Sequence, residues 1–544
     1  MKVVIVGGVA AGMSAATRLR RLREDAEIVV FEAGEHVSYA NCGLPYFISD
    51  VIAMREALLL QTPESLWRRF RIDVRVNTRV TAIDRDSKSV SGFNSITGES
   101  LTENYDYLIL ATGAKPRLLE VPGGERALSL RDVTDADALK AATVGAKTAV
   151  VAGAGFVGIE VAENLRHLGI EVTLVQRGSQ ILSNFDPEMI EPLQAKLVSE
   201  GVEIALGVEI ASIESNAVTL SDGRTIPADL VIAATGVVPD NSLAAGAGLK
   251  IGKTGGLWVD SQQRTSDPNI LAAGDAVEKQ GELTGDQTLI PLANLANRHG
   301  RLMADVIAGI GRESHPALGT AIIGAFGMVA AVTGLTENSA RKAGIEAQAI
   351  HVHPGSHAGY YPGSKRVSLK VLFDPQTGRL LGAQGVGEDG VDKRIDVLAT
   401  AIRAGFKVDD LMDLELSYAP QFGSAKDPIN HLGYVGNNVM NAVTPTLQWH
   451  ELDSALAAGA QLIDVRTARE QEMGVIPGSR LIPVDELRDH VTELEGEIVV
   501  HCAVGQRGHI ATQILRSAGK SVRNLDGGYA TWKSGKDALA RAKG

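Results

Sequence analysis

The chain opens on a hydrophobic pattern that predicts a strand, a turn and a helix. The apolar residues Val3–Val6 are followed by a glycine-rich turn and then by helical spacing of apolar residues over Met13–Leu22. The next apolar run, EIVVFE, ends on Glu32 and predicts a second strand. This order is a βαβ unit, and it recurs from Ala146 onward in AKTAVVAGAGFVGIEVAENLRHLGIEVTLVQRG.

Further apolar strands end in short glycine-containing motifs. Tyr105–Pro116 (YDYLILATGAKP) and Ala228–Asp240 (ADLVIAATGVVPD) both contain Ala-Thr-Gly after the strand, and Asn269–Glu278 (NILAAGDAVE) runs into Gly-Asp. After about Thr320 the pattern changes to shorter alternating strands such as RVSLKVLFD and then to helices, which predicts a mixed α+β region. From Thr444 a last unit shows its own βα pattern in QLIDVRT, RLIPVDEL, EIVVHCAVGQRG and SVRNLDGGY.

These patterns predict an α/β protein with several domains, because 544 residues exceed what one hydrophobic core normally holds. We expect a discontinuous Rossmann-like domain over residues 1–115 and 246–320, and a second one over 116–245. An α+β domain is expected over residues 321–441, and a separate C-terminal α/β domain over 442–544.

Composition and charge narrow the class of protein. The net charge of −12 argues against a general nucleic-acid binder. Two cysteines exclude a disulfide scaffold and fit a reducing compartment. The first apolar run is too short for a secretory signal, and no run approaches the roughly 20 residues that cross a bilayer. We therefore expect a cytoplasmic protein that does not enter a membrane.

The first glycine turn, VVIVGGVAAG, has the composition of a phosphate-binding turn. Gly7, Gly8 and Gly12 allow a tight turn and close packing of helix on strand, although Val9 replaces the second glycine of G-x-G-x-x-G. The start of the helix suits a pyrophosphate. Glu32, at the end of the second strand, is placed to bind a ribose 2′-hydroxyl.

The second turn, VVAGAGFVGIE, satisfies the full motif with Gly153, Gly155 and Gly158. Its second strand ends on Gln176 and Arg177 rather than on an acid. An acid would favour NADH, whereas Arg177 either pairs with the 2′-phosphate of NADPH or is a solvated surface residue. The choice between NADH and NADPH stays open, with NADH slightly favoured.

Two such units, the Ala-Thr-Gly segments and the late Gly-Asp segment resemble the flavoprotein disulfide reductases that bind two dinucleotides. The resemblance implies FAD on the first unit and a nicotinamide dinucleotide on the second. The Asp of the Gly-Asp segment contacts the ribityl–phosphate region of the flavin in that family, which carries over to Asp275. The cofactor-binding residues expected on this basis are Gly7, Gly8, Ala10, Gly12, Glu32, Asn41, Val80, Thr112, Gly113, Gly274, Asp275 and Ala293 for FAD, and Gly153, Gly155, Gly158, Gln176 and Gly236 for the nicotinamide.

Cys42, in SYANCGLPYF, is the candidate redox residue. Better-known members carry a second cysteine, where this chain has Phe47, so the sequence resembles the single-cysteine branch. That branch contains coenzyme A disulfide reductases, NADH oxidases and NADH peroxidases. The peroxidases carry a histidine in the first glycine turn, where this chain has Ala10 and Ala11, and Asn41-Cys42-Gly43 resembles the coenzyme A disulfide reductases.

The same resemblance implies further site residues. Those reductases use one tyrosine from each of two regions across a dimer interface, here HAGYYPGSK and LSYAPQFGSAKDP. Tyr360 and Tyr418 match the spacing better than Tyr361 does, although the choice between Tyr360 and Tyr361 stays open. Coenzyme A carries several phosphate charges that need cationic partners. The residues at the family's ligand positions are Arg18, Arg21, Ser38, Asn41, Arg298 and Lys426.

The C-terminal domain resembles a rhodanese. A strand ends at His501, Cys502 begins a loop expected to hold Gly505 and Arg507, and a helix follows. Backbone N–H groups and a helix N-terminus stabilise a thiolate or a sulfur anion carried on it. Related phosphatases have one more residue between Cys and Arg, so sulfur transfer is favoured over dephosphorylation. The apolar Ala503 and Val504 leave thiosulfate in doubt as the natural donor.

The histidines His351, His353 and His357 alternate along a strand into a glycine loop, so no metal site is expected there. The resemblance as a whole implies an NAD(P)H-dependent flavoenzyme, a homodimer, that reduces coenzyme A persulfide, coenzyme A disulfide or polysulfide. Coenzyme A disulfide reduction or NADH oxidation as the main activity is one alternative. A sulfur-binding sensor or docking protein with a vestigial flavin is another.

Overall fold

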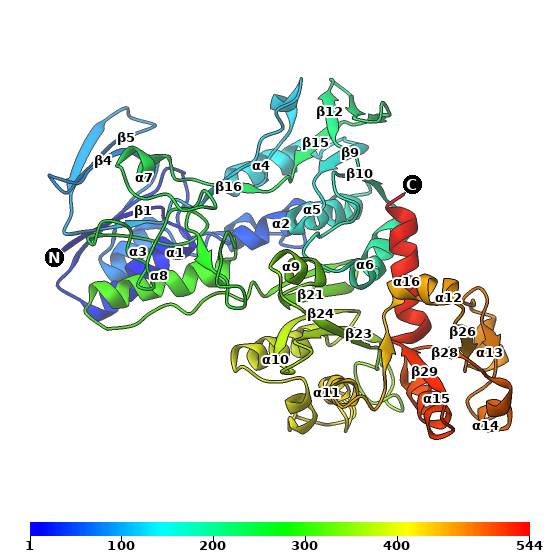
Figure 1. Cartoon of the computed structure of the whole chain (residues 1–544). Coiled ribbons are helices and arrows are strands. Elements are labelled where there is room, and N and C mark those ends of the chain that lie inside the picture. The colour runs from blue at the N-terminus through cyan, green and yellow to red at the C-terminus, as the bar shows by residue number, and fades with distance from the viewer. Residues whose placement is uncertain (544) are drawn as a thin grey trace. The chain divides into compact units, whose positions relative to one another are not determined.

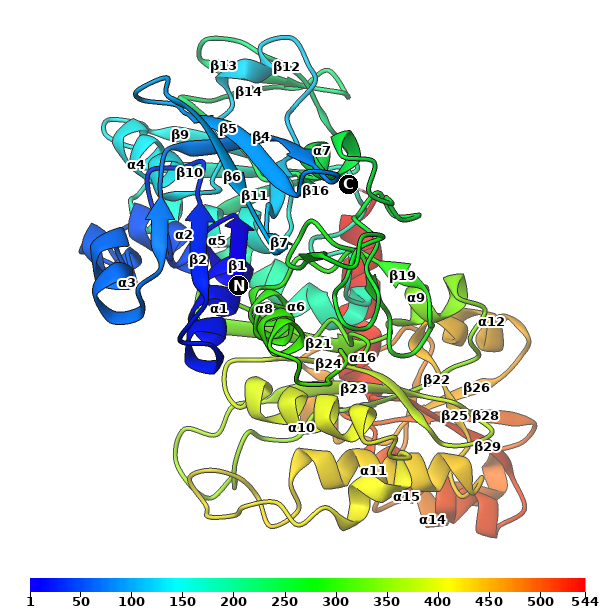
Figure 2. The same cartoon turned by 90° about the vertical axis from the view of Figure 1, so that its left-hand side faces the viewer.

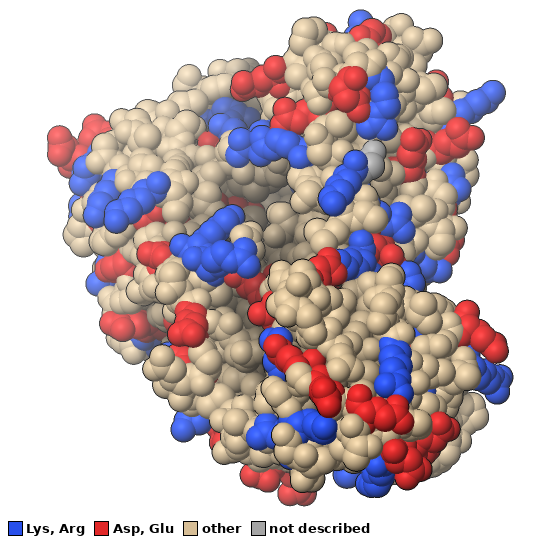
Figure 3. Space-filling model, turned by 45° about the vertical axis from the view of Figure 1, so that its right-hand side comes forward, with Lys and Arg blue, Asp and Glu red and all other residues tan. Residues whose placement is uncertain are grey.

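The structure is a computed structural model, which describes residues 1–543 of the 544-residue chain. Its contacts divide the chain into two compact units (Figure 1). The first comprises Met1–Val175 and Val208–Gly319, and the second comprises Gln176–Gly207 and Thr320–Gly544. Among the described helices, none is both long and apolar enough to cross a bilayer. On the face in Figure 3, Lys and Arg side chains are interspersed with Asp and Glu side chains.

A five-stranded sheet forms the centre of the first unit, with every neighbouring pair parallel. Its spatial order is β17 (Ile270–Ala272), β7 (Tyr107–Leu110), β1 (Lys2–Val6), β2 (Glu27–Phe31) and β3 (Asp73–Arg75). Val3 and Ile5 point into the core beneath α1 (Ala10–Leu22) and α8 (Ala293–Ile307), which pack side by side (Figure 2). Val4 and Val6 point into the core on the opposite face. β1 is therefore buried on both faces, as an apolar run in a parallel sheet requires.

Smaller elements complete this half of the first unit. An antiparallel sheet is formed by β4 (Thr78–Asp84), β5 (Ser89–Asn94) and β6 (Ser100–Asn104). The short helices are α2 (Leu44–Ile48), α3 (Pro63–Phe70), α4 (Val133–Ala142) and α7 (Ser242–Gly246). Two-residue strands β18 (Lys279–Gln280) and β19 (Gln287–Thr288) pair antiparallel.

A second parallel sheet in this unit carries the second glycine turn. β9 (Thr148–Ala152) lies between β10 (Glu171–Gln176) and β15 (Leu230–Ala233). The helix α5 (Phe156–His167) follows β9 directly. An antiparallel sheet of β12 (Ile210–Ile213), β13 (Ala217–Leu220) and β14 (Thr225–Pro227) and the pair β8 (Ala114–Pro116) with β16 (Val237–Pro239) complete it.

The second unit contains an antiparallel five-stranded sheet. Its order is β20 (Ala321–Ala325), β21 (Met328–Gly334), β24 (Leu380–Gly387), β23 (Val367–Phe373) and β22 (Gln348–Val352). The helices of this part are α6 (Pro187–Ser199), α9 (Glu337–Lys342), α10 (Val391–Arg403) and α11 (Pro428–Met440), and β11 (Val202–Leu206) follows α6. The mixed α+β character expected from the sequence is confirmed.

The C-terminal part of the second unit is a parallel α/β domain. Its strand order is β25 (Thr446–Leu447), β29 (Ser521–Leu525), β28 (Glu497–His501), β26 (Gln461–Asp464) and β27 (Arg480–Leu481). Its helices are α12 (Leu452–Ala457), α13 (Ala468–Gln471), α14 (Leu487–His490), α15 (Gln506–Ser517) and α16 (Gly528–Arg541). α16 packs against α6, and Arg541 Nε lies 2.6 Å from Glu191 Oε1.

The expected fold class, α/β with two Rossmann-like parts, a mixed domain and a C-terminal α/β domain, is confirmed. The contacts place Gln176–Gly207 with the second unit, whereas the sequence pattern assigns it to the second Rossmann-like domain. The boundaries of the four expected domains therefore remain a prediction.

Candidate functional site

The first glycine turn is too crowded for side chains. Gly7 has φ +105°, and a Cβ there would lie 2.1 Å from the Ala111 carbonyl oxygen. A Cβ on Gly12 would lie 1.9 Å from the Gly7 carbonyl oxygen. Only glycine permits this close approach of turn, helix and strand, so the start of α1 is left open to a pyrophosphate.

Glu32 follows β2 directly and is held by the turns around it. Its Oε2 accepts a hydrogen bond from the Gly8 N–H at 2.7 Å, and its Oε1 accepts one from the Gly34 N–H at 2.8 Å. The carboxylate therefore stands at the carboxyl end of the second strand, the position at which dinucleotide-binding folds hold a ribose hydroxyl. The residues of this turn fit the adenosine half of FAD.

The other residues expected at the flavin belong to the same unit. Thr112 Oγ1 donates a hydrogen bond to the Asp240 carbonyl at 2.7 Å, and Gly113 has φ +70°. Asp275 is largely enclosed, and burial raises the pKa of its carboxyl despite the opposing charge of Lys279. Burial also lowers the pKa of Lys279 to about 8. Val80 is buried in β4, and Ala293 is the exposed first residue of α8.

Cys42 lies in a single 3₁₀ turn, Asn41–Gly43, immediately before α2. The residue is exposed, but partial desolvation of the thiol, followed by the charges of Glu160 and Asp275, raises the pKa of Cys42. The thiol form of Cys42 is therefore favoured in the protein without a bound cofactor or substrate. Cys502 belongs to the other compact unit, so no second cysteine lies in the unit of Cys42.

Glu160 is a residue of this site that the sequence analysis missed. Burial raises the pKa of Glu160 to about 7, although the Tyr46 hydroxyl, 3.3 Å away, lowers it. A carboxyl that titrates near neutrality beside a reactive thiol is a candidate proton carrier. The available signal was its place in GFVGIE, two residues after Gly158, on the first turns of a helix that follows a phosphate-binding turn.

The second glycine turn leaves more room than the first. Gly153 has φ +101°, and a Cβ on Gly158 would lie 1.9 Å from the Gly153 carbonyl oxygen. A Cβ on Gly155 would meet nothing within 4 Å, and the same holds for Gly236 at φ +100°. Open space above Gly155, at the start of α5, fits the pyrophosphate of a nicotinamide dinucleotide. Gln176 is the last residue of β10, as expected.

Basic residues of α1 and α8 line two adjacent clefts. The first, of about 270 Å³, is lined by Ser14, Thr17, Arg18, Arg21, Asn297 and Arg301. The second, of about 280 Å³, includes Arg298 and shares Arg301 with the first. Arg18 is anchored by Asp305 at 2.7 Å, while the Arg21 guanidinium lies over the Phe70 ring at 5.6 Å. Two of the expected anion ligands, Arg18 and Arg21, thus line one cleft.

Ser38 and Asn41 belong to the segment that leads to Cys42. Ser38 has φ +51°, and its N–H donates a hydrogen bond to the Gly8 carbonyl at 2.8 Å. This bond ties the Cys42 segment to the first glycine turn. Lys426, Tyr360 and Tyr418 belong to the second unit.

The two expected tyrosines are hydrogen-bonded to each other. Tyr360 Oη and Tyr418 Oη lie 2.9 Å apart, and both side chains are exposed. This hydrogen bond raises the pKa of Tyr360. Tyr361 instead packs edge to face on His357, with ring centroids 5.8 Å apart. The two adjacent tyrosines therefore have different partners, and Tyr360, which the sequence spacing favoured, is the one that contacts Tyr418.

The C-terminal cysteine lies between a buried strand and a helix. Cys502 follows β28 and is fully buried, and Gly505, at φ +90°, precedes α15. Arg507 lies in the first turn of α15 and not in the loop, so that expectation was wrong: the helix begins one residue earlier, at Gln506. Both Glu470 oxygens accept hydrogen bonds from Arg507, which lower the pKa of Glu470 to about 2.

Two clusters of potential metal ligands, one of histidines and one of carboxylates, have protein side chains as their partners. His351 contacts Asp526 and Glu188, and His353 contacts Ser368 and Thr531. Asp186, Glu188 and Glu337 converge closely enough to bind a cation, but Lys370 Nζ lies within 3.0 Å of each of them. The lysine ammonium occupies the position that a metal ion would take.

The chain belongs to the pyridine nucleotide-disulphide oxidoreductase family, whose model matches residues 1–300. The dimerisation domain of that family matches residues 322–427, and a rhodanese-like domain matches residues 448–535. The resemblance inferred from the two glycine turns and from Cys502 is confirmed.

Similar proteins narrow the family further. A coenzyme A disulfide reductase of Staphylococcus aureus (strain bovine RF122 / ET3-1) is 34% identical over 436 residues, 80% of this chain and 99% of that protein. Reduced Bacillus anthracis CoADR-RHD is similar with a TM-score of 0.97 and 43% identity, over 99% of this chain and 98% of that one. An NAD-dependent persulfide reductase from A. fulgidus is similar with a TM-score of 0.92 and 36% identity, over 98% of this chain and 100% of that one.

Proposed function

We propose that this protein is an NAD(P)H-dependent FAD enzyme that reduces coenzyme A persulfide and polysulfide, with sulfane sulfur handled by its rhodanese domain. The observation that carries the proposal is the exposed, solitary Cys42 beside a dinucleotide-binding turn in a chain that also has a rhodanese cysteine. With coenzyme A persulfide the reaction consumes NAD(P)H and a proton, and releases coenzyme A and hydrogen sulfide. Similarity to the persulfide reductase supports this substrate class.

Cofactor binding is assigned to the two glycine turns. Gly7, Gly8, Ala10, Gly12, Glu32, Asn41, Val80, Thr112, Gly113, Gly274, Asp275 and Ala293 are proposed to hold FAD. Gly153, Gly155, Gly158, Gln176 and Gly236 are proposed to hold the nicotinamide dinucleotide. NADH is slightly favoured over NADPH, and Arg177 is the candidate partner for the 2′-phosphate of NADPH. When bound, FAD supplies two-electron transfer from the nicotinamide toward Cys42.

The residues proposed to act on the substrate with Cys42 have separate roles. Its thiolate attacks a substrate sulfur, so a new S–S bond forms at Cys42 while the substrate S–S bond breaks. The leaving sulfur takes a proton from the Tyr360–Tyr418 pair. Arg18, Arg21, Arg298 and Lys426 neutralise the phosphates of coenzyme A, and Ser38 and Asn41 seat the substrate near the thiol.

Cys502 is proposed to load sulfane sulfur, with Arg507 orienting the anionic donor. Coenzyme A is the proposed carrier of sulfur between Cys502 and Cys42. We further propose that the enzyme is a cytoplasmic homodimer, supported by the match to a dimerisation domain and by the reduced state that two unpaired cysteines require.

A second candidate is coenzyme A disulfide reduction as the main activity, since a relative of that name shares 34% identity with this chain. Steady-state oxidation of NADH and NADPH separates the two, measured with coenzyme A persulfide, polysulfide, coenzyme A disulfide and oxygen. The proposal expects the highest kcat/KM for the persulfide. A higher kcat/KM for the disulfide favours the second candidate, and a protein that binds no flavin contradicts both.

A further inference from the structure

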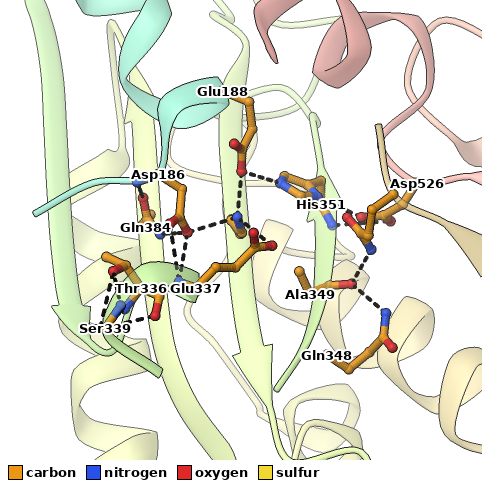
Figure 4. Close-up of polar contacts among 12 residues, drawn as sticks. Asp186, Glu188, Thr336, Glu337, Ser339, Gln348, Ala349, His351, Gln384 and Asp526 are labelled. Carbon is orange, nitrogen blue, oxygen red and sulfur yellow. Dashed lines mark hydrogen bonds and ion pairs between the residues drawn. The ribbon is translucent and has the colours of Figure 1, made fainter. Parts of the chain in front are cut away.

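The edge strand of the antiparallel sheet contacts the rhodanese domain through polar groups (Figure 4). The His351 N–H of β22 donates a hydrogen bond to Asp526 Oδ1 at 3.3 Å, and His351 Nδ1 lies 2.6 Å from Asp526 Oδ2. Gln448 Nε2 donates a hydrogen bond to the Ala349 carbonyl at 2.9 Å. Both contacts satisfy groups on a strand edge that would otherwise need water.

His351 is held between two carboxylates. Its Nε2 lies 3.2 Å from Glu188 Oε1, while its Nδ1 faces Asp526, and the side chain is fully buried. A carboxylate at each ring nitrogen is satisfied only when both nitrogens carry protons. Burial lowers the pKa of His351, but the two carboxylates outweigh it and raise the pKa to about 9.

Other ionisable groups face this histidine. Lys370 on β23 is also fully buried, and its ammonium bonds to Glu188 Oε1, the same oxygen that faces His351. His353 follows β22, and burial lowers its pKa to about 3, so it is neutral. A buried pair that loses one partner leaves an uncompensated charge, which is strongly destabilising. The protonated form of His351 is therefore required by its surroundings at neutral pH.

The link continues from His351 to the loop of Cys502 through two glycines. Gly527 and Gly528 both have φ +64°. A Cβ on Gly527 would lie 2.9 Å from the His351 Cβ, and a Cβ on Gly528 would lie 2.5 Å from the Cys502 carbonyl oxygen. The Tyr529 N–H donates a hydrogen bond to that same carbonyl at 2.8 Å. His351 thus contacts the turn Asp526–Tyr529, and this turn in its own right contacts the Cys502 loop.

We propose that His351 is a positioning residue for sulfur transfer, which fixes the turn Asp526–Tyr529 and through it the backbone of the Cys502 loop. The inference goes beyond the proposed function, since it assigns a role to a histidine of the antiparallel sheet, and it rests on sulfur transfer at Cys502. The interaction with Asp526 and Glu188 is complete at low pH and is lost as the pH rises through about 9.

The test compares His351→Gln and Asp526→Asn with the matched control His353→Gln. His353 contacts the same domain through Thr531 at 2.7 Å, and among the described residues its ring bonds to Ser368 and Thr531 rather than to Asp526. Thiosulfate serves as the probe: Cys502 takes its outer sulfur, sulfite leaves, and cyanide removes the sulfur as thiocyanate. Coenzyme A disulfide-dependent NADH oxidation at Cys42 is measured on the same holoenzyme preparation.

We expect His351→Gln to lower kcat for thiocyanate formation about tenfold or more, with coenzyme A disulfide reduction and His353→Gln within twofold of wild type. The ratio of wild-type to His351→Gln rates falls toward one as the pH rises through about 9. The double variant His351→Gln/Asp526→Asn is expected to have a kcat for thiocyanate formation at least threefold above that of His351→Gln, because it removes the carboxylate left without a partner.

Equal losses in His351→Gln and His353→Gln, or a wild-type to variant ratio that does not change with pH, overturn the proposal. If His351→Gln does not fold, the same two activities are compared between Asp526→Asn and wild type. Hydrogen exchange of the wild-type enzyme is then measured between pH 7 and 10. Protection relative to the intrinsic exchange rate at each pH must fall together in peptides covering residues 348–352 and 500–506, and independent changes in protection contradict the link. If wild-type enzyme shows no Cys502-dependent thiocyanate formation, the sulfur-transfer part of the proposed function fails, and hydrogen exchange alone decides the link.

Discussion

The hydroxyl groups of Tyr360 and Tyr418 lie 2.9 Å apart although 58 residues separate them in sequence. Neither side chain is buried, so packing alone does not hold them together. One hydroxyl must donate and the other accept, which makes the pair a single proton-carrying unit. The hydrogen bond with Tyr418 raises the pKa of Tyr360, so its hydroxyl is protonated at neutral pH, as the proposed donation of a proton to a leaving sulfur requires.

The first prediction is that Tyr418→Phe and Tyr360→Phe each lower kcat for coenzyme A persulfide by about 10²-fold, the usual contribution of general acid catalysis. The double variant is no slower than the slower single variant by more than about threefold, because both residues act as one unit. Steady-state NADH oxidation measures both effects. Tyr361→Phe is the control. If it lowers kcat as much as Tyr360→Phe does, the hydrogen bond to Tyr418 does not explain the role of Tyr360.

Gly155 and Gly158, two of the three glycines of the second turn, predict opposite behaviour when each is replaced by alanine. Gly155→Ala adds a methyl group where nothing lies within 4 Å, so the protein folds and keeps its flavin, but KM for NADH rises at least tenfold. Gly158→Ala places a methyl group 1.9 Å from a carbonyl oxygen and destabilises the unit by about 1–3 kcal/mol. Thermal unfolding and the flavin content of the purified proteins separate the two. An unchanged KM in Gly155→Ala contradicts the assigned nicotinamide site.

Arg21 and Arg68 form a matched pair for testing the basic cleft. Arg21 lines the cleft, whereas Arg68 is an exposed residue of α3. Arg21→Ala is expected to raise KM for coenzyme A disulfide about tenfold, the loss of about one charge-assisted hydrogen bond. KM for polysulfide, which has no phosphate, stays within twofold, and Arg68→Ala changes neither. An equal rise in both KM values would mean that Arg21 does not recognise the phosphates.

The Arg507–Glu470 ion pair predicts an effect on sulfur transfer and a loss of domain stability at low pH. Arg507→Ala abolishes most Cys502-dependent sulfur transfer, and Arg507→Lys recovers little because it cannot bind Glu470 through two nitrogens. The folded-state pKa of Glu470, about 2, is below its ordinary value of about 4.3. The pair therefore stabilises the domain above about pH 4.3 and loses this effect as the pH falls toward 2. The free energies of unfolding of Glu470→Gln and of the wild-type protein must therefore converge as the pH falls from about 4.3 to 2.

Much of this architecture could be predicted from sequence, because the signals are local. Val3–Val6, the glycine turn and Glu32 follow one another along the chain, and the structure has them as β1, the turn and the acid after β2. Cys502 after an apolar strand is equally local. Each of these depends on backbone geometry that a few adjacent residues dictate.

What the sequence could not predict depends on contacts between distant segments. Lys370 lies in an alternating strand pattern that suggests exposure, yet it is fully buried among Asp186, Glu188 and Glu337, which come from other elements. Glu160 was missed because its raised pKa comes from burial, which one sequence does not reveal. The pairing of Tyr360 rather than Tyr361 with Tyr418 also depends on side-chain direction at neighbouring positions.

The most direct test of the account is single-turnover and steady-state reduction of coenzyme A persulfide by NADH with wild-type, Cys42→Ser and Cys502→Ser holoenzymes. We predict that Cys42→Ser binds flavin, accepts electrons from NADH and releases no hydrogen sulfide. Cys502→Ser is expected to keep coenzyme A persulfide turnover within about threefold of wild type and to lose only thiosulfate-dependent thiocyanate formation. Hydrogen sulfide release by Cys42→Ser at the wild-type rate would contradict the central claim that Cys42 is the sulfur-reducing residue.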